Sequence, residues 1–474
     1  MSPPGPQPKT GPLALAGAKR VYDVVVLGSD LGGAATAALL AKRGLRVCMA
    51  TLGPAQVARE SQGWLLPNAH PVVPPLRQLS GASAALDELG LGQDLQRLAS
   101  PGASAIQILS DRLRLSLPAD LTRRRAELRR ELSAEDAAQV ESGLDALEQL
   151  GRPWDPFLVA APPYPARGFF ERRRLAKMIP TPPALPQGLT GAALDAVAPF
   201  AASLVGECAP EAQAREAAAL LRAPLRIWGG AAQLADLCRK KALEAGADLF
   251  PEDVSRLELE RKGVVLQLGG AEVRASSCIV ACDGAKLTAI CANVGRSERK
   301  LAEEASLLVS RKVALCHFVV RADGLPLALE EAALLLGAAG GPLLVSSLPA
   351  RRVKGETQGE RLLTVARAVP VDESDAPAIL EAVRAALEPV LPFFDRHIVH
   401  QAADLDPAQL QPLFAPDPEG QPLGLRPDSD AHNRALFASS GVYPGFGLEG
   451  QLVAARTCAN TAMELSGRKQ VAAV

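Results

Sequence analysis

Residues 23–51, DVVVLGSDLGGAATAALLAKRGLRVCMAT, constrain the fold of this chain more than any other segment. The short apolar, β-branched run at 23–27 is typical of a strand that is buried on both faces of a parallel sheet. A glycine-rich turn at 28–33 follows it, and the next residues form a helix whose small side chains allow close packing on a sheet. The run RVCMA at 46–50 then supplies a second strand. The segment therefore predicts a βαβ unit in a parallel sheet.

The glycine-rich turn predicts a dinucleotide site. Such a turn between a strand and a helix, within a unit of about thirty residues, is the fingerprint of proteins that bind a diphosphate at the helix N-terminus. The alternative is an ordinary α/β turn that is rich in glycine. Gly28, Gly32 and Gly33 fit the fingerprint, but Asp30 stands where such a loop usually keeps a glycine so that the diphosphate can approach closely.

Length and composition narrow the class of protein. A chain of 474 residues predicts two or three domains. A net charge of -1 gives no overall attraction to nucleic acid, so we expect no nucleic-acid partner.

The 8 cysteines form no CxxC pair and no disulfide framework, which predicts a reduced, cytoplasmic protein. We interpret Cys278, Cys282 and Cys291 as structural thiols of a buried strand and predict no metal site. Residues 1–20 are rich in proline and are expected to form a disordered leader.

Three further segments extend the argument to most of the chain. Residues 228–284 contain a Gly-Gly helix start, a short strand around Val254, a hairpin and a strand that ends at Cys282. Residues 343–370 predict paired strands, and residues 436–455 predict a strand followed by a Pro-Gly-x-Gly helix start. In this order and spacing, they resemble the FAD-dependent phytoene desaturase and amine oxidase superfamily, and more closely its bacterial phytoene-dehydrogenase-like members. The likeness covers nearly the whole chain after residue 20.

The resemblance implies a fold class and a division into domains. The fold would be α/β, with a Rossmann-like FAD/NAD(P)-binding domain that is discontinuous in sequence and an inserted α+β substrate domain. The FAD-binding-like domain would comprise residues 21–110, 225–300 and 430–474. The substrate or cap domain would comprise residues 111–224 and 301–429.

The resemblance also implies which positions hold FAD. The first glycine loop would hold the diphosphate, and the end of the second strand would hold the adenosine ribose. The main chain near Val254 would contact the adenine, and the PGxGxxG helix start would face the flavin. The implied positions are Gly28, Asp30, Gly32, Gly33, Thr51, Val254, Ser440, Gly441, Pro444, Gly445, Gly447 and Gly450.

Three of these positions depart from the pattern of the superfamily. Asp30 adds bulk and charge, and its repulsion at ~5 Å and an effective dielectric of ~20 costs about 3 kcal/mol for each phosphate charge. Thr51 replaces a carboxylate that would accept two ribose hydroxyl bonds, at a cost of roughly 1.5 to 3 kcal/mol. Ser440 stands where an aspartate would precede the Pro-Gly turn. The effect of Asp30 would be smaller if it were protonated or paired with an arginine such as Arg43.

The segment 153–183 combines aromatic and basic residues. Aromatic side chains beside a basic cluster suit peripheral contact with an anionic membrane surface. They also suit a helix whose aromatic side packs inward while its arginines lie in solvent, and we favour this second interpretation. The residues are Trp154, Phe157, Tyr164, Phe169, Phe170, Arg172, Arg173, Arg174 and Lys177.

Two classes of function follow. The first is an FAD-dependent oxidoreductase of the phytoene-dehydrogenase type, which oxidises an apolar small molecule while the flavin carries the chemistry. No arrangement of histidine, serine, cysteine or paired carboxylates offers independent catalysis, so no catalytic residue is predicted. The alternative is a pseudoenzyme that has lost FAD and binds or scaffolds a protein partner, in an assembly or at a membrane. A carrier of an apolar ligand is a variant of this alternative.

Overall fold

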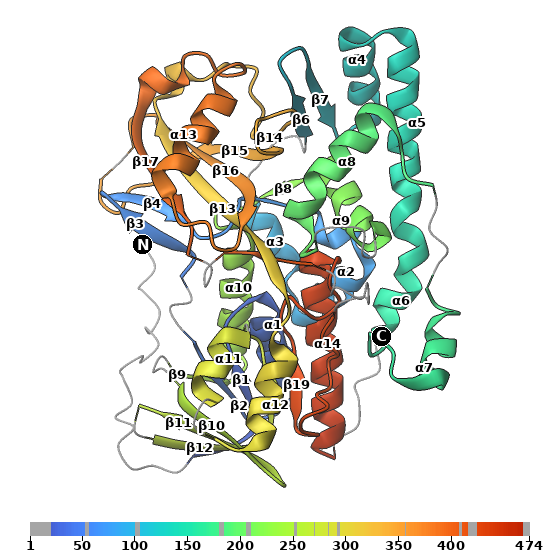
Figure 1. The fold of residues 1–474 in the computed structure, drawn as a ribbon, viewed down its shortest axis with the longest axis vertical. Helices are drawn as coiled ribbons and strands as arrows, with labels where there is room; N and C mark the ends of the chain where they lie inside the picture. Colours follow the sequence, from blue (N-terminus) through green and yellow to red (C-terminus); the bar gives the residue numbers. More distant parts are fainter. Residues whose placement is uncertain are drawn as a thin grey trace, which may run out of the picture.

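The computed structural model describes residues 20–52, 56–99, 105–179, 184–204, 210–250, 254–269, 271–282, 284–291, 294–355, 357–406, 410–415 and 424–467. The predicted leader lies outside these residues, apart from Arg20. Two sheets organise the described chain, one in the lower half and one in the upper half of the view in Figure 1.

The first sheet contains the predicted βαβ unit. Its strands, in spatial order, are β10 (Val254–Glu260), β11 (Gly263–Leu268), β12 (Ala271–Val280), β1 (Arg20–Leu27), β2 (Val47–Ala50) and β9 (Asp248–Phe250), with β19 (Ala435–Phe437) beside β12. β1 runs parallel to β2, as predicted, and it also runs parallel to β12. The last four residues of β1 are fully buried because helices cover both faces of the sheet. β12 ends at Val280, whereas the sequence predicts that this strand ends at Cys282.

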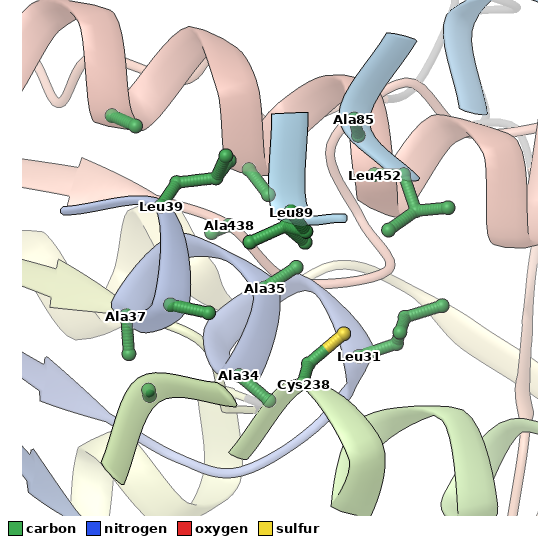
Figure 2. Close-up of a cluster of buried hydrophobic side chains, with 14 of the residues drawn as sticks. Leu31, Ala34, Ala35, Ala37, Leu39, Ala85, Leu89, Cys238, Ala438 and Leu452 are labelled. Atoms are coloured by element: carbon green, nitrogen blue, oxygen red, sulfur yellow. The ribbon is translucent and has the colours of Figure 1, made fainter. Parts of the chain in front are cut away.

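The helix of the βαβ unit is α1 (Leu31–Lys42), and it is buried along nearly its whole length. It packs between α10 (Gly230–Glu244), α14 (Gly447–Leu465) and α2 (Ser80–Leu89). Figure 2 shows Ala34 of α1 beside Cys238 of α10, and Ala35 of α1 near Leu89 of α2. Such small side chains let the helix approach its neighbours closely.

The second sheet is mostly antiparallel. Its strands, in spatial order, are β17 (Ile398–Asp404), β13 (Val309–Val320), β16 (Arg361–Pro370), β15 (Leu343–Pro349), β14 (Ala332–Leu335), β6 (Ala105–Leu109) and β7 (Arg114–Pro118), with β18 (Pro412–Phe414) beside β13. Among its described strands, only β6 and β14 pair in parallel. Alternate residues point to opposite faces: Leu315 packs among the side chains on the face of α8 (Gly188–Ala201), and Cys316 on the face of α13 (Ala376–Leu387).

The other described elements connect and cover the sheets. The helices are α3 (Gly92–Leu98), α4 (Leu121–Glu131), α5 (Ala134–Gly151), α6 (Asp155–Ala160), α7 (Gly168–Leu175), α9 (Pro210–Arg222), α11 (Gly284–Cys291) and α12 (Arg296–Ala305), with short 3₁₀ helices at Leu76–Gln78, Arg152–Trp154, Ala322–Gly324 and Phe394–His397. Two small ribbons pair β3 (Ala58–Ser61) with β4 (Trp64–Pro67), and β5 (Val72–Val73) with β8 (Leu225–Arg226).

The predicted α/β fold class is confirmed, because the structure combines a largely parallel sheet and an antiparallel sheet with covering helices. The division into domains stays a prediction. The predicted boundary at residue 110 falls between β6 and β7, which are two strands of one hairpin in the second sheet. In the part of the chain that the structure covers, no helix has the length and apolar content that a membrane span requires.

The aromatic residues of 153–183 divide into two groups. Trp154 and Phe157 are buried, and their rings lie 5.6 Å apart. Tyr164 packs on Phe157 at 5.7 Å. Phe169 and Phe170 are exposed, so the prediction that the aromatic side packs inward is correct for the first three rings and wrong for these two.

Candidate functional site

The start of α1 lies at the centre of the first sheet, where the parallel strands end. The Gly28 N–H donates to the Ala50 carbonyl at 2.9 Å, which ties the turn to β2 directly before Thr51. The Ala281 N–H donates to the Leu27 carbonyl at 2.7 Å, which brings the end of β12 to the same place. Open α/β sheets bind ligands at such a point, where neighbouring strands connect in opposite directions.

Asp30 caps α1 with its own side chain. The Gly33 N–H donates to Asp30 Oδ1 at 2.9 Å, and Asp30 has the extended backbone of an N-cap residue. The first turn of a helix leaves N–H groups without partners, and aspartate is a preferred cap for them. The same N–H groups are those that bind a phosphate at a helix start. The Asp30 carboxylate therefore occupies, as an internal anion, a position that the sequence assigns to the diphosphate.

Two states of Asp30 would reduce its repulsion of a diphosphate: protonation of its carboxyl group and pairing with Arg43. The pairing with Arg43 is wrong, because Arg43 Nε contacts Glu88 Oε1 at 2.8 Å and its Nη1 contacts Asn460 at 2.9 Å. Burial raises the pKa of Asp30 to about 7, against the opposing effects of the Gly33 hydrogen bond and the Lys286 charge. This direction supports partial protonation of Asp30 at neutral pH.

The raised pKa of Asp30 predicts a dependence of stability on pH. The folded state holds the Asp30 proton more tightly than the unfolded state does, so the contribution of Asp30 to the free energy of unfolding is largest below about pH 4 and falls as the pH rises towards 7. Asp30→Asn keeps an oxygen that can accept from Gly33 but carries no charge. Urea denaturation is expected to show wild type losing stability relative to this variant as the pH rises through that window.

Asp120→Asn is the matched control, because Asp120 caps α4 at 2.8 Å through Arg123 N–H in an exposed position. The same pH dependence in both comparisons would contradict the assignment to burial of Asp30.

A second carboxylate caps the start of α14. Glu216 of α9 is buried, and its Oε1 accepts from the N–H groups of Leu448 at 2.9 Å and Glu449 at 3.3 Å. These groups belong to the first turn of α14, which begins at Gly447 and forms the predicted PGxGxxG helix start. The second helix start that the sequence assigns to the cofactor is thus also filled by a side chain of the protein.

Buried charges surround Glu216. Arg215 Nε contacts Glu449 Oε2 at 2.6 Å, and both side chains are at most 1% exposed. Arg215 Nη2 also contacts Asp155 Oδ1 at 2.8 Å, and the Gly81 N–H donates to Glu449 at 2.9 Å. Burial, and next the charge of Glu449, raise the pKa of Glu216 well above its usual value. The cluster therefore favours a neutral Glu216 beside an ionised Arg215–Glu449 pair.

The glycines at the start of the βαβ helix lie against backbone atoms of other parts of the chain. A Cβ atom on Gly28 would lie 2.1 Å from the Ala281 carbonyl oxygen, and one on Gly32 would lie 1.9 Å from the Ala438 carbonyl oxygen. Gly28 also has a φ of +104°, which favours glycine. These glycines are required by the close packing of α1 on the ends of β12 and β19.

Gly33 has the same kind of environment, since a Cβ atom there would lie 2.5 Å from Ala281 Cβ. In a dinucleotide fingerprint, the first and third glycines serve the turn and the helix–sheet packing, and the second lets the diphosphate approach. This chain keeps Gly28 and Gly33 and replaces the second position by Asp30. It retains the glycines with a packing role and lacks the one whose role is to admit a ligand.

The C-terminal glycines are also covered by protein atoms. A Cβ atom on Gly445 would lie 2.9 Å from Leu204 Cδ1, and one on Gly447 would lie 2.0 Å from the Ala201 carbonyl oxygen. The covering atoms come from α8 and the residues between α8 and α9. The start of α14 is therefore in direct contact with the helical part of the chain.

The remaining predicted positions lie at several places. A Cβ atom on Gly441 would contact Leu307, and one on Gly450 would contact the Tyr443 carbonyl oxygen. Pro444 is buried, and Ser440 and Thr51 are half-buried. Val254 is buried at the first residue of β10, where it pairs with Leu268. Val254 and Thr51 were both expected at the adenosine, yet three strands separate β10 from β2 in the sheet.

Comparison of the whole fold adds an independent finding. No protein-family model matches the sequence, and no curated protein matches it significantly. An oxidoreductase from Methanosarcina mazei has 15% identity and a TM-score of 0.58, over 92% of this chain and 99% of that one. A double mutant of putrescine oxidase has 15% identity and a TM-score of 0.55, over 95% and 100% of the two chains. Cyclohexylamine oxidase from Brevibacterium oxydans IH-35A has 15% identity and a TM-score of 0.53, over 94% and 99%.

The chain has the fold of these oxidases and of this oxidoreductase. Identities this low show the fold and leave the phytoene-type activity a hypothesis. Within this fold, the two capped helix starts lie at the positions that the sequence resemblance assigns to a cofactor.

Sequence analysis did not identify Arg215 and Glu216 as part of the site. Their segment, EAQAREAAALLR, places alanines around the charged residues, and such small residues allow a helix to pack closely on its neighbours. Charged residues inside such a helix require partners, because an unpaired buried charge is costly. The charged residues in this helix could therefore have been predicted to have buried partners. The sequence does not indicate that α14 supplies those partners.

Proposed function

We propose that this protein does not bind FAD and acts as a binding or scaffolding protein on an oxidoreductase fold. One observation carries the proposal: both helix starts that would receive the cofactor are capped from within. Asp30 accepts from Gly33 N–H, and Glu216 accepts from the first turn of α14. A diphosphate would compete with Asp30 for the N–H groups at the start of α1, and Glu216 occupies the N–H groups of the helix start that would face the flavin.

The expected loss of affinity is large. To free the Gly33 N–H, Asp30 would have to give up a capping bond worth about 0.5 to 2 kcal/mol. If the ionised carboxylate stayed at ~5 Å, its repulsion would add about 3 kcal/mol for each phosphate charge, which is on the order of a hundredfold in affinity. Partial protonation of Asp30 reduces the repulsion but leaves the hydrogen bond to Gly33 in place.

The competing function is an FAD-dependent oxidoreductase that acts on an apolar, phytoene-like small molecule. The agreement in fold with known oxidases over more than nine tenths of the chain favours it. The chain offers no separate catalytic group, so this function requires the flavin. Whether the protein retains FAD therefore distinguishes the two proposals.

The experiment is an absorption spectrum of the freshly purified protein, before and after incubation with FAD and gel filtration. We expect no flavin bands in either sample. Flavin at nearly one molecule per chain would overturn the proposal and favour the oxidoreductase.

A pair of variants tests the role of Asp30 directly. Asp30→Gly restores the missing glycine and removes the internal anion, so titration followed by flavin fluorescence is expected to show FAD binding at least ten times tighter than wild type. Asp120→Gly removes a comparable helix cap elsewhere and is expected to leave FAD binding unchanged. Equal binding by wild type and Asp30→Gly would show that Asp30 is not the obstacle.

A further inference from the structure

The outward face of α7 carries two exposed phenylalanines. Phe169 is 70% exposed and Phe170 is 85% exposed, and their rings lie 5.8 Å apart. The chain contains 11 phenylalanines, and this adjacent pair is exposed on one short helix. In Figure 1, α7 lies at the lower right edge of the protein beside α6. Large exposed apolar side chains that lie together mark interaction surfaces.

Cations lie beside these rings. Arg173 follows Phe169 by four residues and Arg174 follows Phe170 by four, so each pair shares one side of the helix. Arg172 and Lys177 are also exposed. Within the described residues, the side chains of these four cations have no ion-pair partner. The face therefore combines two apolar rings with four uncompensated positive charges.

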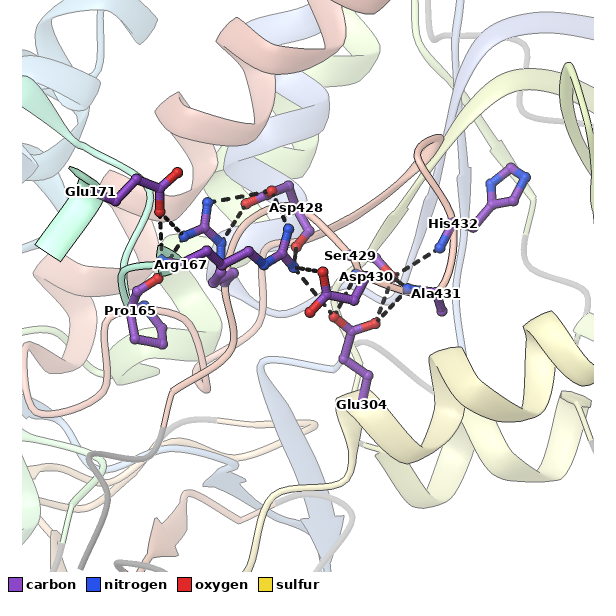
Figure 3. A network of polar contacts seen from close by, with 10 residues as sticks. Pro165, Arg167, Glu171, Glu304, Asp428, Ser429, Asp430, Ala431 and His432 are labelled. Atoms are coloured by element: carbon purple, nitrogen blue, oxygen red, sulfur yellow. Dashed lines mark hydrogen bonds and ion pairs between the residues drawn. The ribbon is translucent and has the colours of Figure 1, made fainter. Parts of the chain in front are cut away.

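The opposite side of α7 packs on the hydrophobic core, and ion pairs hold the helix and the residue before it. Leu175 is 4% exposed and belongs to the core below the helix. Arg426 Nη1 contacts Glu171 Oε2 at 2.7 Å, and Arg167 Nη1 contacts Asp428 Oδ2 at 2.8 Å, as Figure 3 shows. Glu171, the only acidic residue of α7, is thus paired with Arg426 while its side chain stays 45% exposed, and these contacts hold the helix in place.

We infer that this face of α7 docks on an anionic lipid surface. At such a surface the two rings enter the headgroup boundary while the arginines and the lysine contact lipid phosphates, which is the arrangement that peripheral membrane helices use. The ion pair with Arg426 compensates the charge of Glu171, the one negative charge of the helix.

The alternatives fit the surface less well. A single-stranded nucleic acid stacks its bases on flat aromatic platforms, whereas the planes of the Phe169 and Phe170 rings are inclined at 78°. An acidic protein partner would engage the cations without requiring two rings to be buried. The inference is independent of whether FAD is bound.

The test is flotation of the full chain with phosphatidylglycerol vesicles and with phosphatidylcholine vesicles. We expect binding to the former at low salt and at least tenfold weaker binding to the latter. Phe169→Ala with Phe170→Ala, and separately Arg173→Gln with Arg174→Gln, are each expected to reduce binding to phosphatidylglycerol by at least tenfold. These substitutions lie on the exposed face, so the fold is expected to remain intact.

Matched controls complete the test. Phe393→Ala removes a ring that is 64% exposed on another surface, and Arg123→Gln with Arg129→Gln removes two exposed charges from α4. Both controls are expected to bind vesicles as wild type does. Equal binding to the two kinds of vesicle, or loss of binding in the controls as well, would overturn the inference. Salt-sensitive binding that depends on the arginines but not on the phenylalanines would also overturn it and would indicate a polyanion or an acidic protein.

Discussion

Replacing Arg215 by alanine is expected to lower the free energy of unfolding by about 3 to 5 kcal/mol. Arg215 is 1% exposed, and its guanidinium is the partner of Glu449, which is fully buried. Without the guanidinium, Glu449 would remain as a buried carboxylate with no opposite charge beside it. Removing one partner of a buried pair costs far more than the pair contributes in total, because the remaining charge lacks both water and a partner. Urea denaturation at neutral pH measures the loss.

Two comparisons test this cause. Arg222→Ala removes an arginine of the same helix whose side chain is 44% exposed and pairs with Glu148 at 3.0 Å, so a loss of only about 0 to 1 kcal/mol is expected. Adding Glu449→Gln to Arg215→Ala removes the unpaired charge and is expected to restore part of the lost stability. If the double variant is no more stable than the single one, the loss comes from packing and not from charge.

Replacing Gly32 by alanine is the second substitution with a large expected effect. In an isolated helix, this change would stabilise by about 1 kcal/mol. Here the new methyl group would lie 1.9 Å from the Ala438 carbonyl oxygen, which belongs to the backbone. Helix α1 or the end of β19 would have to shift, and such overpacking typically costs about 1 to 3 kcal/mol. We therefore expect the free energy of unfolding to fall by roughly 2 to 3 kcal/mol, in the absence of any cofactor.

Gly92→Ala is the matched control for Gly32→Ala. Gly92 opens α3, and the nearest atom to its added Cβ would be Arg77 Nη1 at 3.1 Å, the end of a flexible side chain. Its effect is expected to stay within about 0.5 kcal/mol of zero. If Gly32→Ala were equally harmless, the retained glycines would not be packing residues.

The sequence predicted the local structure of the βαβ unit well, because the relevant signals are local. The apolar run at 23–27, the glycine turn and the small-residue helix determine the βαβ unit within about thirty residues. The departure at Asp30 was visible for the same reason, since the fingerprint has a fixed spacing. The side-chain direction of Asp30 was not visible: the capping bond to Gly33 and the pairing of Arg43 with Glu88 required coordinates.

Long-range features could not be predicted in this way. Glu216 lies more than two hundred residues from the helix start that it caps, and no pattern in the sequence links the two. The aromatic segment shows a local signal beside a long-range one. Phe157 is followed by the apolar run LVAA, whereas Phe169 and Phe170 are followed by ERRR, which favours exposure of the second pair. The partner of Phe157, the ring of Phe446 at 6.4 Å just before α14, required coordinates.

The internal caps also affect how this protein would depend on its surroundings. A protein that binds a cofactor only when folded gains stability in proportion to the logarithm of the free ligand concentration, so its abundance follows the supply of that ligand. In this chain Asp30 and Glu216 are covalently part of the molecule, and their concentration at the two helix starts does not vary. If it needs no flavin to satisfy those N–H groups, its amount in a cell would be uncoupled from vitamin supply, unlike that of an enzyme with the same fold.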